Sequence, residues 1–301
     1  MPLLELTFDL APLAGVEEAA AVESACFEAG ALSVTLTDAA DDPVLEPLPG
    51  EVRLWPRTRV EALFPRDTVP LVTARAIAAA LALPPERILA REIEDRAWER
   101  EWLAHFHAMR FGRRLWVAPH HERVAEPGAV VVRLDPGLAF GTGTHPTTAL
   151  CLEWLDERLE PGPGTRVIDY GCGSGILGLA AAKLGAARVE CFDIDPQALI
   201  ATEANAAANG VADRVSAVGR DGELTASADV LLSNILAEPL VRLAPRFADL
   251  TRAGGALVLA GLLASQADEV TEAYRAWFDM SCFGARDDWV GLTGVRRSRG
   301  P

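Results

Sequence analysis

Apolar and polar residues alternate along the first part of the chain. Over residues 3–10 every second position is Leu or Phe, and most positions between them are Glu, Thr or Asp. Shorter or weaker alternation recurs over residues 32–36, 60–64 and 87–93. A period of two residues is typical of a half-buried strand, so these four stretches predict strands.

Two Ala-rich stretches without this alternation lie between the predicted strands. Residues 17–29 end at Gly30, a typical helix C-cap, and residues 69–83 are stopped by a Pro-Pro pair, so both stretches predict helices. The resulting order is strand–helix–strand–strand–helix–strand, which is the ferredoxin-like arrangement. We therefore expect a small N-terminal α+β domain.

The second half of the chain has a different rhythm, in which apolar strand-like runs alternate with helical stretches. This pattern predicts an α/β domain with a doubly wound, mostly parallel, Rossmann-like sheet. The expected strands are 114–119, 129–135, 166–170, 189–193, 214–218, 229–234 and 256–261, with further antiparallel strands over 289–296. The expected helices are 149–159, 175–184, 197–208, 236–248 and 266–278.

A chain of 301 residues is long enough for two domains. We expect an N-terminal domain over residues 1–97, a linker helix and lead-in over 98–128, and the α/β domain over 129–301. An aromatic side chain recurs every four residues in the linker, and the stripe consists of Trp98, Trp102 and Phe106. Packing between the domains is the favoured interpretation of this stripe, ahead of a platform for a substrate.

Charge narrows the range of partners. The formal net charge of the chain is −15, and residues 1–97 alone carry 17 acidic and 8 basic side chains, a net charge of −9. Such a surface argues against stable, direct binding of nucleic acid through its phosphates. It is compatible with a basic protein partner.

Cysteine usage and hydropathy indicate the compartment. The five cysteines lack the paired spacing of a metal site, so we expect buried free thiols in a reducing cytoplasm and no metal. The most extended apolar run, residues 256–264, is far shorter than the ~18–20 residues of a membrane span. The first residues carry acids and no basic region, so we expect no signal peptide. We expect a cytoplasmic monomer without a membrane segment.

A glycine-rich turn follows the strand predicted at 166–170. The apolar run there ends in Asp169, and Gly171, Gly173 and Gly175 come next, before a predicted helix. Glycines permit a tight turn and the close approach of a ligand to the backbone at a helix N-terminus. The dinucleotide pattern of such glycines is weak evidence by itself. The acid before them would repel a pyrophosphate but suits the ammonium group of S-adenosylmethionine.

Polar side chains end two further predicted strands. Asp193 follows the next strand, about 20 residues after the glycines, where an acid can hydrogen-bond both hydroxyls of a ribose. Asp195 precedes Pro196, and we expect it only to cap the following helix. Asn234 ends a third strand; its carbonyl could accept a hydrogen bond from a substrate amine, or it could cap the helix that follows.

The stretch 141–148, Gly-Thr-Gly-Thr-His-Pro-Thr-Thr, concentrates small polar residues before a predicted helix. Pro146 suits the first helical turn, and a capped helix start would explain Thr144 and Pro146 but not the whole group. We expect this stretch, with Thr148, to fold over the methionine end of the cofactor. His145 is a candidate proton acceptor, and a role at the helix start is an equal alternative.

Together these stretches resemble the ribosomal protein L11 methyltransferase (PrmA) family, and the likeness covers nearly the whole chain. The matching stretches are Leu134-Asp-Pro-Gly-Leu-Ala-Phe-Gly-Thr-Gly-Thr-His-Pro-Thr-Thr, Val167-Ile-Asp-Tyr-Gly-Cys-Gly-Ser-Gly-Ile-Leu, Asp193-Ile-Asp-Pro-Gln-Ala, Asn234-Ile-Leu-Ala, Glu46-Pro-Leu-Pro-Gly-Glu and Trp98-Glu-Arg-Glu-Trp. The resemblance implies a cytoplasmic enzyme that transfers methyl groups from S-adenosylmethionine to lysine side-chain and N-terminal amines of ribosomal protein L11. It implies that the N-terminal domain recognises this basic protein.

The resemblance also implies roles for individual residues. It assigns Thr148, Gly171, Asp193 and Asn234 to the cofactor. We also expect Asn234 to orient the amine. Many other amino-group methyltransferases have Asn-Pro-Pro-Tyr where this chain has Asn-Ile-Leu-Ala. The aromatic wall over the target nitrogen must therefore come from elsewhere, and Phe140 and the tryptophans are the candidates.

The same residues bear on three other functions. An NAD-linked oxidoreductase is disfavoured by the acid before the glycines. A non-enzymatic adaptor is disfavoured because Asp169, the glycine turn, Asp193 and Asn234 are all present. The nearest alternative is a methyltransferase of the same fold that acts on another protein or on a small amine.

Overall fold

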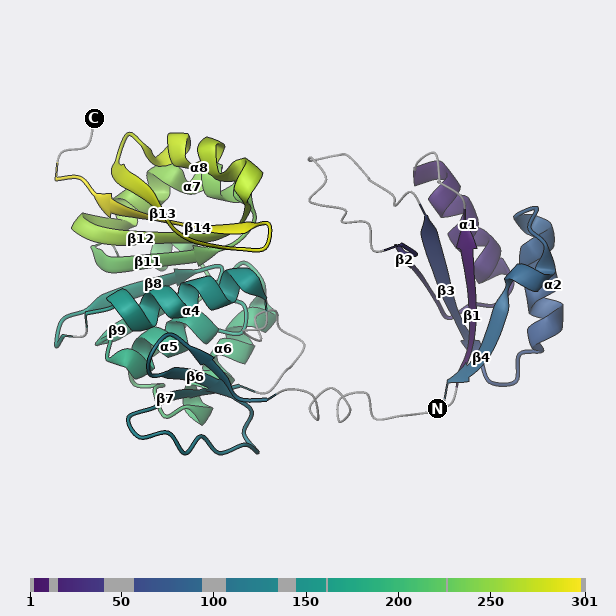
Figure 1. Ribbon diagram of the computed structural model, residues 1–301, viewed down its shortest axis with the longest axis horizontal. Coiled ribbons are helices and arrows are strands. Elements are labelled where there is room, and N and C mark those ends of the chain that lie inside the picture. Colours follow the sequence, from purple (N-terminus) through teal and green to yellow (C-terminus); the bar gives the residue numbers. More distant parts are fainter. Residues whose placement is uncertain are drawn as a thin grey trace. The chain divides into compact units, whose positions relative to one another are not determined.

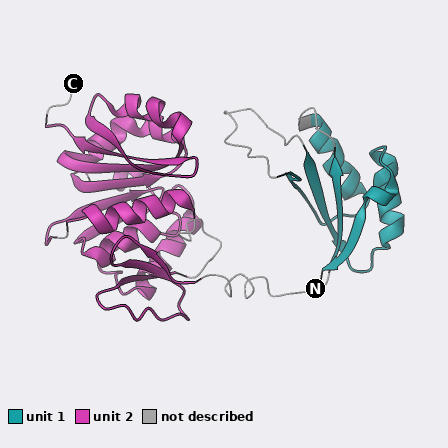
Figure 2. Cartoon of the chain, in the orientation of Figure 1, with its two compact units in different colours: residues 1–98 teal, residues 99–301 magenta. Residues whose placement is uncertain are grey.

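The computed structural model describes residues 3–10, 16–40, 57–93, 107–134, 145–160, 162–225 and 227–298. The chain divides into two compact units, residues 1–98 and 99–301 (Figure 2). The aromatic stripe expected around Trp98, Trp102 and Phe106 lies outside the described residues, as do residues 141–144 of the stretch 141–148.

The first unit is a four-stranded antiparallel sheet with two helices on one face (Figure 1). Its elements are β1 (Leu3–Leu10), α1 (Val16–Glu28), β2 (Ser33–Asp38), β3 (Thr58–Pro65), α2 (Pro70–Ala80), a 3-10 turn (Pro85–Arg87) and β4 (Leu89–Ile93). The strand order β2-β3-β1-β4 confirms the ferredoxin-like arrangement. The alternation in β1 buries Leu6 and Phe8 against the helices, where Phe64 and Ile77 complete the core.

The second unit is built on a seven-stranded sheet with the order β10-β9-β8-β11-β12-β14-β13. Its strands are β8 (Arg166–Tyr170), β9 (Arg188–Phe192), β10 (Val215–Val218), β11 (Ala228–Asn234), β12 (Thr251–Leu263), β13 (Phe278–Arg286) and β14 (Trp289–Arg296). The first five strands in this order pair in parallel, and β14 pairs antiparallel with both of its neighbours. The doubly wound, mostly parallel sheet is therefore confirmed.

Helices cover both faces of this sheet (Figure 1). One face packs against α4 (Pro146–Arg158), α5 (Ile176–Leu184) and α6 (Pro196–Ala208), and the other against α7 (Ala237–Leu250) and α8 (Ala267–Tyr274). β8 and β9 are buried on both faces, so apolar side chains dominate them after the first residue; the exceptions, Asp169 and Glu190, are buried as well.

A small sheet of three strands adjoins the α4 face. It consists of β5 (Met109–Phe111), β6 (Leu115–Ala118) and β7 (Val130–Arg133), with β5 antiparallel and β7 parallel to β6. Leu115 and Val117 are fully buried in the same cluster as α4 and α5. The buried carboxylate of Asp156 on α4 accepts hydrogen bonds from the backbone N–H groups of Arg113 and Arg114, which ties the β5–β6 turn to this helix.

Three expectations were wrong in detail. The helix expected to reach residue 278 ends at Tyr274, because Phe278 begins β13 and pairs with Arg296 in the sheet. The strand expected over 256–261 extends from Thr251 to Leu263. Four cysteines are buried as expected, but Cys282 is exposed on β13, the outermost strand of the sheet.

Candidate functional site

Three of the predicted site residues lie where neighbouring parallel strands end. Asp169 is near the end of β8, Asp193 directly follows β9, and Asn234 is the last residue of β11. β8 lies between β9 and β11 in the sheet. The carboxyl ends of the three strands therefore meet at one edge, which is where ligands bind in sheets of this kind.

The glycine turn between β8 and α5 needs its glycines for the backbone itself. Gly171, Gly173 and Gly175 have φ angles of +81°, +53° and +79°, in the region that other residues rarely adopt. A side chain at Gly171 would also collide with Ile235. Gly175 is the N-cap of α5. The turn thus presents backbone, without side chains, at the N-terminus of a helix.

Asp169 is a buried carboxyl group whose hydrogen bonding is incomplete. It is 1% exposed, and its Oδ2 accepts a hydrogen bond from the N–H of Gly178 at 2.8 Å. Among the described residues, no donor reaches its Oδ1. Burial raises the pKa of Asp169 to about 7, against the effect of the Gly178 N–H and with a small contribution from Asp193. A cationic donor placed beside it would lower that pKa and complete its hydrogen bonding.

Asp193 is held by two backbone groups. Its Oδ2 accepts from the N–H of Gly173 and its Oδ1 from the N–H of Asp195, both at 2.9 Å. The first bond ties the end of β9 to the glycine turn. Each carboxylate oxygen can accept more than one hydrogen bond, so a ligand hydroxyl can still bind there. Asp195 caps α6 through the N–H of Gln197 with Pro196 at the first helical position, which confirms its expected capping role.

Asn234 meets Thr148 although the two are far apart in sequence. The Asn234 Nδ2 donates to the Thr148 Oγ1 at 3.2 Å, and Thr148 is buried in the first turn of α4. Asn234 does not cap the helix that follows it, because the N-cap of α7 is Leu236. With Nδ2 directed at Thr148, the carbonyl oxygen of Asn234 is the atom that can accept a hydrogen bond from an amine.

His145 is the N-cap of α4. Its Nδ1 accepts from the N–H of Thr147 and lies 2.7 Å from the Thr147 hydroxyl, and Pro146 is in the first helical turn. Burial lowers the pKa of His145, which favours the neutral ring that this cap requires. The ring also contacts Trp289 edge-on, with the ring centroids 4.9 Å apart. Because the lone pair of Nδ1 is engaged, the geometry favours the cap over proton acceptance.

Two further residues near this edge, Asp221 and Trp289, were not singled out from the sequence. Asp221 is the third residue after β10, whereas Asp193 directly follows β9, so a search for acids within a few residues of each strand end would have found it. Burial and the Asp221 carboxylate, which hydrogen-bonds Tyr170, raise the pKa of the Tyr170 phenol to about 12. Trp289 begins β14, which pairs with the carboxyl end of β12. Its place beside His145 depends on the packing of distant elements, and no local pattern indicates it.

The chain matches the sequence profile of the ribosomal protein L11 methyltransferase (PrmA) family over residues 10–297. A ribosomal protein L11 methyltransferase of Pseudomonas paraeruginosa is 49% identical over 99% of this chain and all of its own length. That of Edwardsiella ictaluri is 51% identical over 93% of this chain and 96% of its own length.

A solved structure is also similar. The ribosomal protein L11 methylase of Lactobacillus delbrueckii subsp. bulgaricus superposes with a TM-score of 0.58 at 30% identity, and the match covers 64% of this chain and all of that one. The profile match extends over both units, and the relatives align over nearly their whole length. The chain therefore belongs to the ribosomal protein L11 methyltransferase (PrmA) family.

Proposed function

We propose that this methyltransferase uses S-adenosylmethionine to methylate lysine side-chain and N-terminal amines of ribosomal protein L11. The chain belongs to this family, and one structural observation supports the proposal. Asp169, Asp193 and Asn234 end adjacent strands, and Asn234 is hydrogen-bonded to Thr148 at the N-terminus of α4.

The described residues fit this cofactor. Asp169 is a buried acid with an Oδ1 that lacks a donor among the described residues, and the cofactor carries an ammonium group. The Asp193 carboxylate suits the two ribose hydroxyls, and the side-chain-free turn of Gly171, Gly173 and Gly175 permits close approach. When bound, S-adenosylmethionine supplies a methyl group activated by the positive sulfonium. Thr148 holds Asn234 in place beside this site.

The enzyme must bind its target amine without the proton. A free lysine amine has a pKa of about 10.4, so it is mostly protonated at neutral pH. Removal from water in a closed site lowers that pKa and favours the neutral amine. The Asn234 carbonyl then accepts a hydrogen bond from the amine and directs its lone pair, so that alignment supplies much of the rate. Asn234→Ala should therefore lower turnover more than cofactor affinity, and equal losses would reduce Asn234 to a cofactor contact.

Trp289 is our candidate for the aromatic wall over the target nitrogen. Its ring lies against His145 at the N-terminus of α4, which also carries Thr148. The other candidate named from sequence, Phe140, lies outside the described residues. For His145 itself we propose the role that its geometry supports, which is to cap α4 and so to place Thr148.

For the first unit we propose recognition of the basic protein substrate. The sheet face opposite α1 and α2 holds a pocket of about 860 Å³, lined mostly by polar and charged residues of β1, β3, β4 and the 3-10 turn before β4. Ion pairs join Arg59 to Asp9 and Arg91 to Glu5 on this face. The net charge of −9 over residues 1–97 suits a basic partner.

We place the reaction in the cytoplasm, the compartment expected for a protein with free thiols and a ribosomal protein substrate. Within the described residues, no helix has both the length and the apolar character that a bilayer span requires.

The deciding experiment uses radiolabelled S-adenosylmethionine and ribosomal proteins from a strain that lacks this enzyme. We expect the purified protein to label a single band, which mass spectrometry identifies as L11. Label on another protein would keep the methyltransferase and change its substrate. Absence of label, together with absence of cofactor binding by calorimetry, would overturn the proposal.

A further inference from the structure

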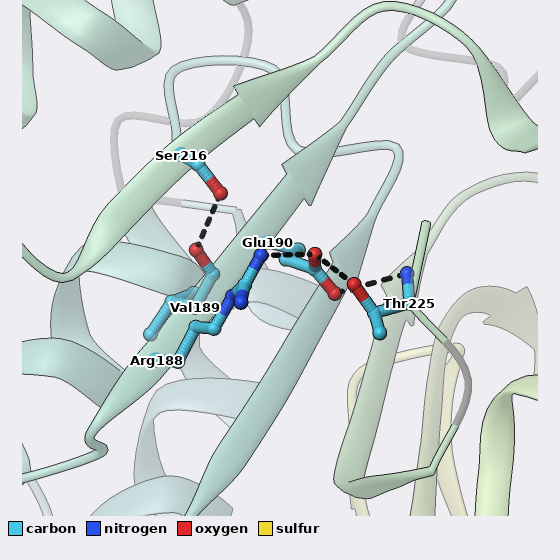
Figure 3. A network of polar contacts seen from close by, with 5 residues as sticks. All are labelled: Arg188, Val189, Glu190, Ser216 and Thr225. Atoms are coloured by element: carbon cyan, nitrogen blue, oxygen red, sulfur yellow. Dashed lines mark hydrogen bonds and ion pairs between the residues drawn. The ribbon is translucent and has the colours of Figure 1, made fainter. Parts of the chain in front are cut away.

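A buried acid lies in the sheet away from the residues assigned above. Glu190 is in the middle of β9, and its side chain is 5% exposed. Side chains alternate along a strand, so Glu190 points to the same face as Phe192, which packs in the α7 and α8 cluster. Figure 3 shows that Glu190 reaches Arg188 on one side and Thr225 on the other.

The Glu190 carboxylate binds Thr225 through both oxygens. The Thr225 hydroxyl donates to Oε1 at 2.6 Å, and the Thr225 N–H donates to Oε2 at 3.2 Å. The guanidinium of Arg188, which is mostly exposed, donates to Oε1 at 3.1 Å. Burial of a carboxylate costs free energy that such bonds only offset, and a well-packed apolar side chain is often at least as stabilising. Stability alone therefore gives no reason for an acid here.

Thr225 belongs to the connection between β10 and β11. These two strands are parallel and are separated in the sheet by β9 and β8, so the chain must return from the carboxyl edge to the amino edge. Such a return is usually made by an α-helix. In the described part of this connection, residues 219–225 and 227, the only helical turn is the 3-10 turn Asp221–Glu223. Two hydrogen bonds from Thr225 to the Glu190 carboxylate attach this segment to the middle of β9 (Figure 3).

The other end of the same segment lies at the carboxyl edge of the sheet. Asp221 pairs with Arg246 of α7 at 2.9 Å and hydrogen-bonds the phenol of Tyr170. Leu224 is buried in the same cluster as Tyr170 and Phe192. These two aromatic residues directly precede Gly171 and Asp193, so the segment packs against both strand ends that we assign to the cofactor.

We infer that Glu190 is a positioning residue for the cofactor site. Through Thr225 it holds the segment 219–225 against β9, so that Asp221 and Leu224 support the ends of β8 and β9 in the geometry that binds the cofactor. The inference rests on the cofactor site proposed above. If the loosened segment kept this geometry a tenth of the time, the apparent Kd for the cofactor would rise about tenfold.

The test compares isosteric variants at two acids. In Glu190→Gln, one carboxylate oxygen becomes an amide NH2 group, which cannot accept a hydrogen bond. At least one of the three hydrogen bonds from Arg188 and Thr225 is therefore lost. Asp229→Asn is the matched control, because Asp229 also accepts a backbone N–H, that of Arg166, and a guanidinium, that of Arg252. It lies at the amino end of β11, away from the cofactor edge.

Calorimetry with S-adenosylhomocysteine measures the cofactor site, and hydrogen–deuterium exchange measures the segment. We expect Glu190→Gln to raise the Kd about tenfold, to raise KM for the methyl donor more than it lowers kcat, and to speed exchange over residues 219–225. Asp229→Asn should keep the wild-type Kd even where it lowers the melting temperature equally.

Should Glu190→Gln fail to fold, Thr225→Val removes only the hydroxyl donor and should raise the Kd about threefold. Its control is Thr251→Val, which removes a buried hydroxyl that donates to Phe247 O. Wild-type affinity in the folded Glu190 or Thr225 variants would overturn the inference and leave the cofactor site standing. Failure of the wild-type protein to bind S-adenosylhomocysteine would overturn the proposed cofactor site, and this inference with it.

Discussion

Asp169 and Asp193 are carboxyl groups on adjacent strand ends, yet their surroundings differ. Asp193 accepts two backbone N–H groups at the surface end of β9, whereas Asp169 is buried with a single N–H partner. Full burial raises the pKa of Asp169 to about 7. The two acids therefore suit different parts of a ligand: one suits an ammonium group and the other suits hydroxyls.

Asp169 makes the stability of the free protein depend on pH. An unfolded Asp titrates near pH 3.9, so between about pH 4 and pH 7 the folded state keeps a proton that the unfolded state has lost. Stability should therefore fall as pH rises through this window, by at most about 4 kcal/mol for a shift of about three units. Denaturant unfolding of the wild type and of Asp169→Asn at pH 4, 5.5 and 7 measures the difference. Parallel curves would show that Asp169 has an ordinary pKa.

Asp193 and Asp195 form a second matched pair. Asp193→Ala should weaken binding of S-adenosylmethionine, because it removes the acceptor for the ribose and the tie to Gly173. Asp195→Ala removes only the cap of α6 and should cost about 1 kcal/mol of stability. Calorimetry and thermal unfolding on both variants separate the two effects. Unchanged affinity in Asp193→Ala would count against its role at the ribose.

At the scale of elements, α4 joins several parts of the second unit. Its N-terminus carries His145, Thr147 and Thr148 beside Asn234, and near its C-terminus Asp156 holds the β5–β6 turn. The buried side chains of α4 pack in the core with α5. A helix anchored at both ends is a rigid support for the residue that faces Asn234.

Variants of His145 distinguish two roles for this residue, N-cap of α4 and general base. Asn is a good N-cap, so His145→Asn should keep the stability and leave kcat within about threefold, whereas His145→Ala should cost about 1 kcal/mol. Because burial lowers the pKa of His145, the wild-type cap should weaken as pH falls below about 6.5 through that lowered pKa. Thermal unfolding and turnover are measured for both variants. A loss of about a hundredfold in kcat with intact stability in His145→Asn would instead indicate general base catalysis.

At the scale of the whole molecule, recognition and chemistry are assigned to different units. The first unit has its own core, formed by β1, β3 and the two helices, and the second has a core on each face of its sheet. Each unit therefore has the means to hold its own fold. If the first unit recognises the substrate as proposed, substrate choice can change there without disturbing the cofactor site proposed in the second unit.

Charge on the first unit should appear in the salt dependence of the reaction. The net charge of −9 over residues 1–97 attracts a basic substrate, and the Debye length shortens from about 10 Å at 0.1 M salt as salt is added. We expect kcat/KM for L11 to fall between 0.05 and 0.3 M NaCl while kcat at saturating L11 stays constant. A chain without residues 1–98 should keep its cofactor affinity and lose most of its kcat/KM for L11. An L11 KM that is indifferent to salt and to this truncation would overturn the recognition role.

Most of the fold follows from local patterns in the sequence. Alternation over residues 3–10 and the strand-helix rhythm after residue 166 are local, and each persisted because it agrees with what the core requires. The glycine turn was equally predictable, because three positive φ angles leave few other residues possible. Asp195-Pro196 is a helix start that can be identified from two adjacent residues.

What the tertiary structure decided is which distant residues meet. The Thr148–Asn234 hydrogen bond, the Trp289–His145 contact and the Glu190–Thr225 bonds join separate elements, so their partners depend on packing that no local pattern encodes. The same cause ended the last helix at Tyr274, since pairing of Phe278 with β14 outweighed helical periodicity. The sequence by itself determined the two folds and the acids at the strand ends, because periodicity and turn chemistry act over a few residues. The contact of His145 with Trp289 and the hydrogen bonds of Glu190 with Thr225 were decided by long-range packing, which forms only once the sheet and its helices are assembled.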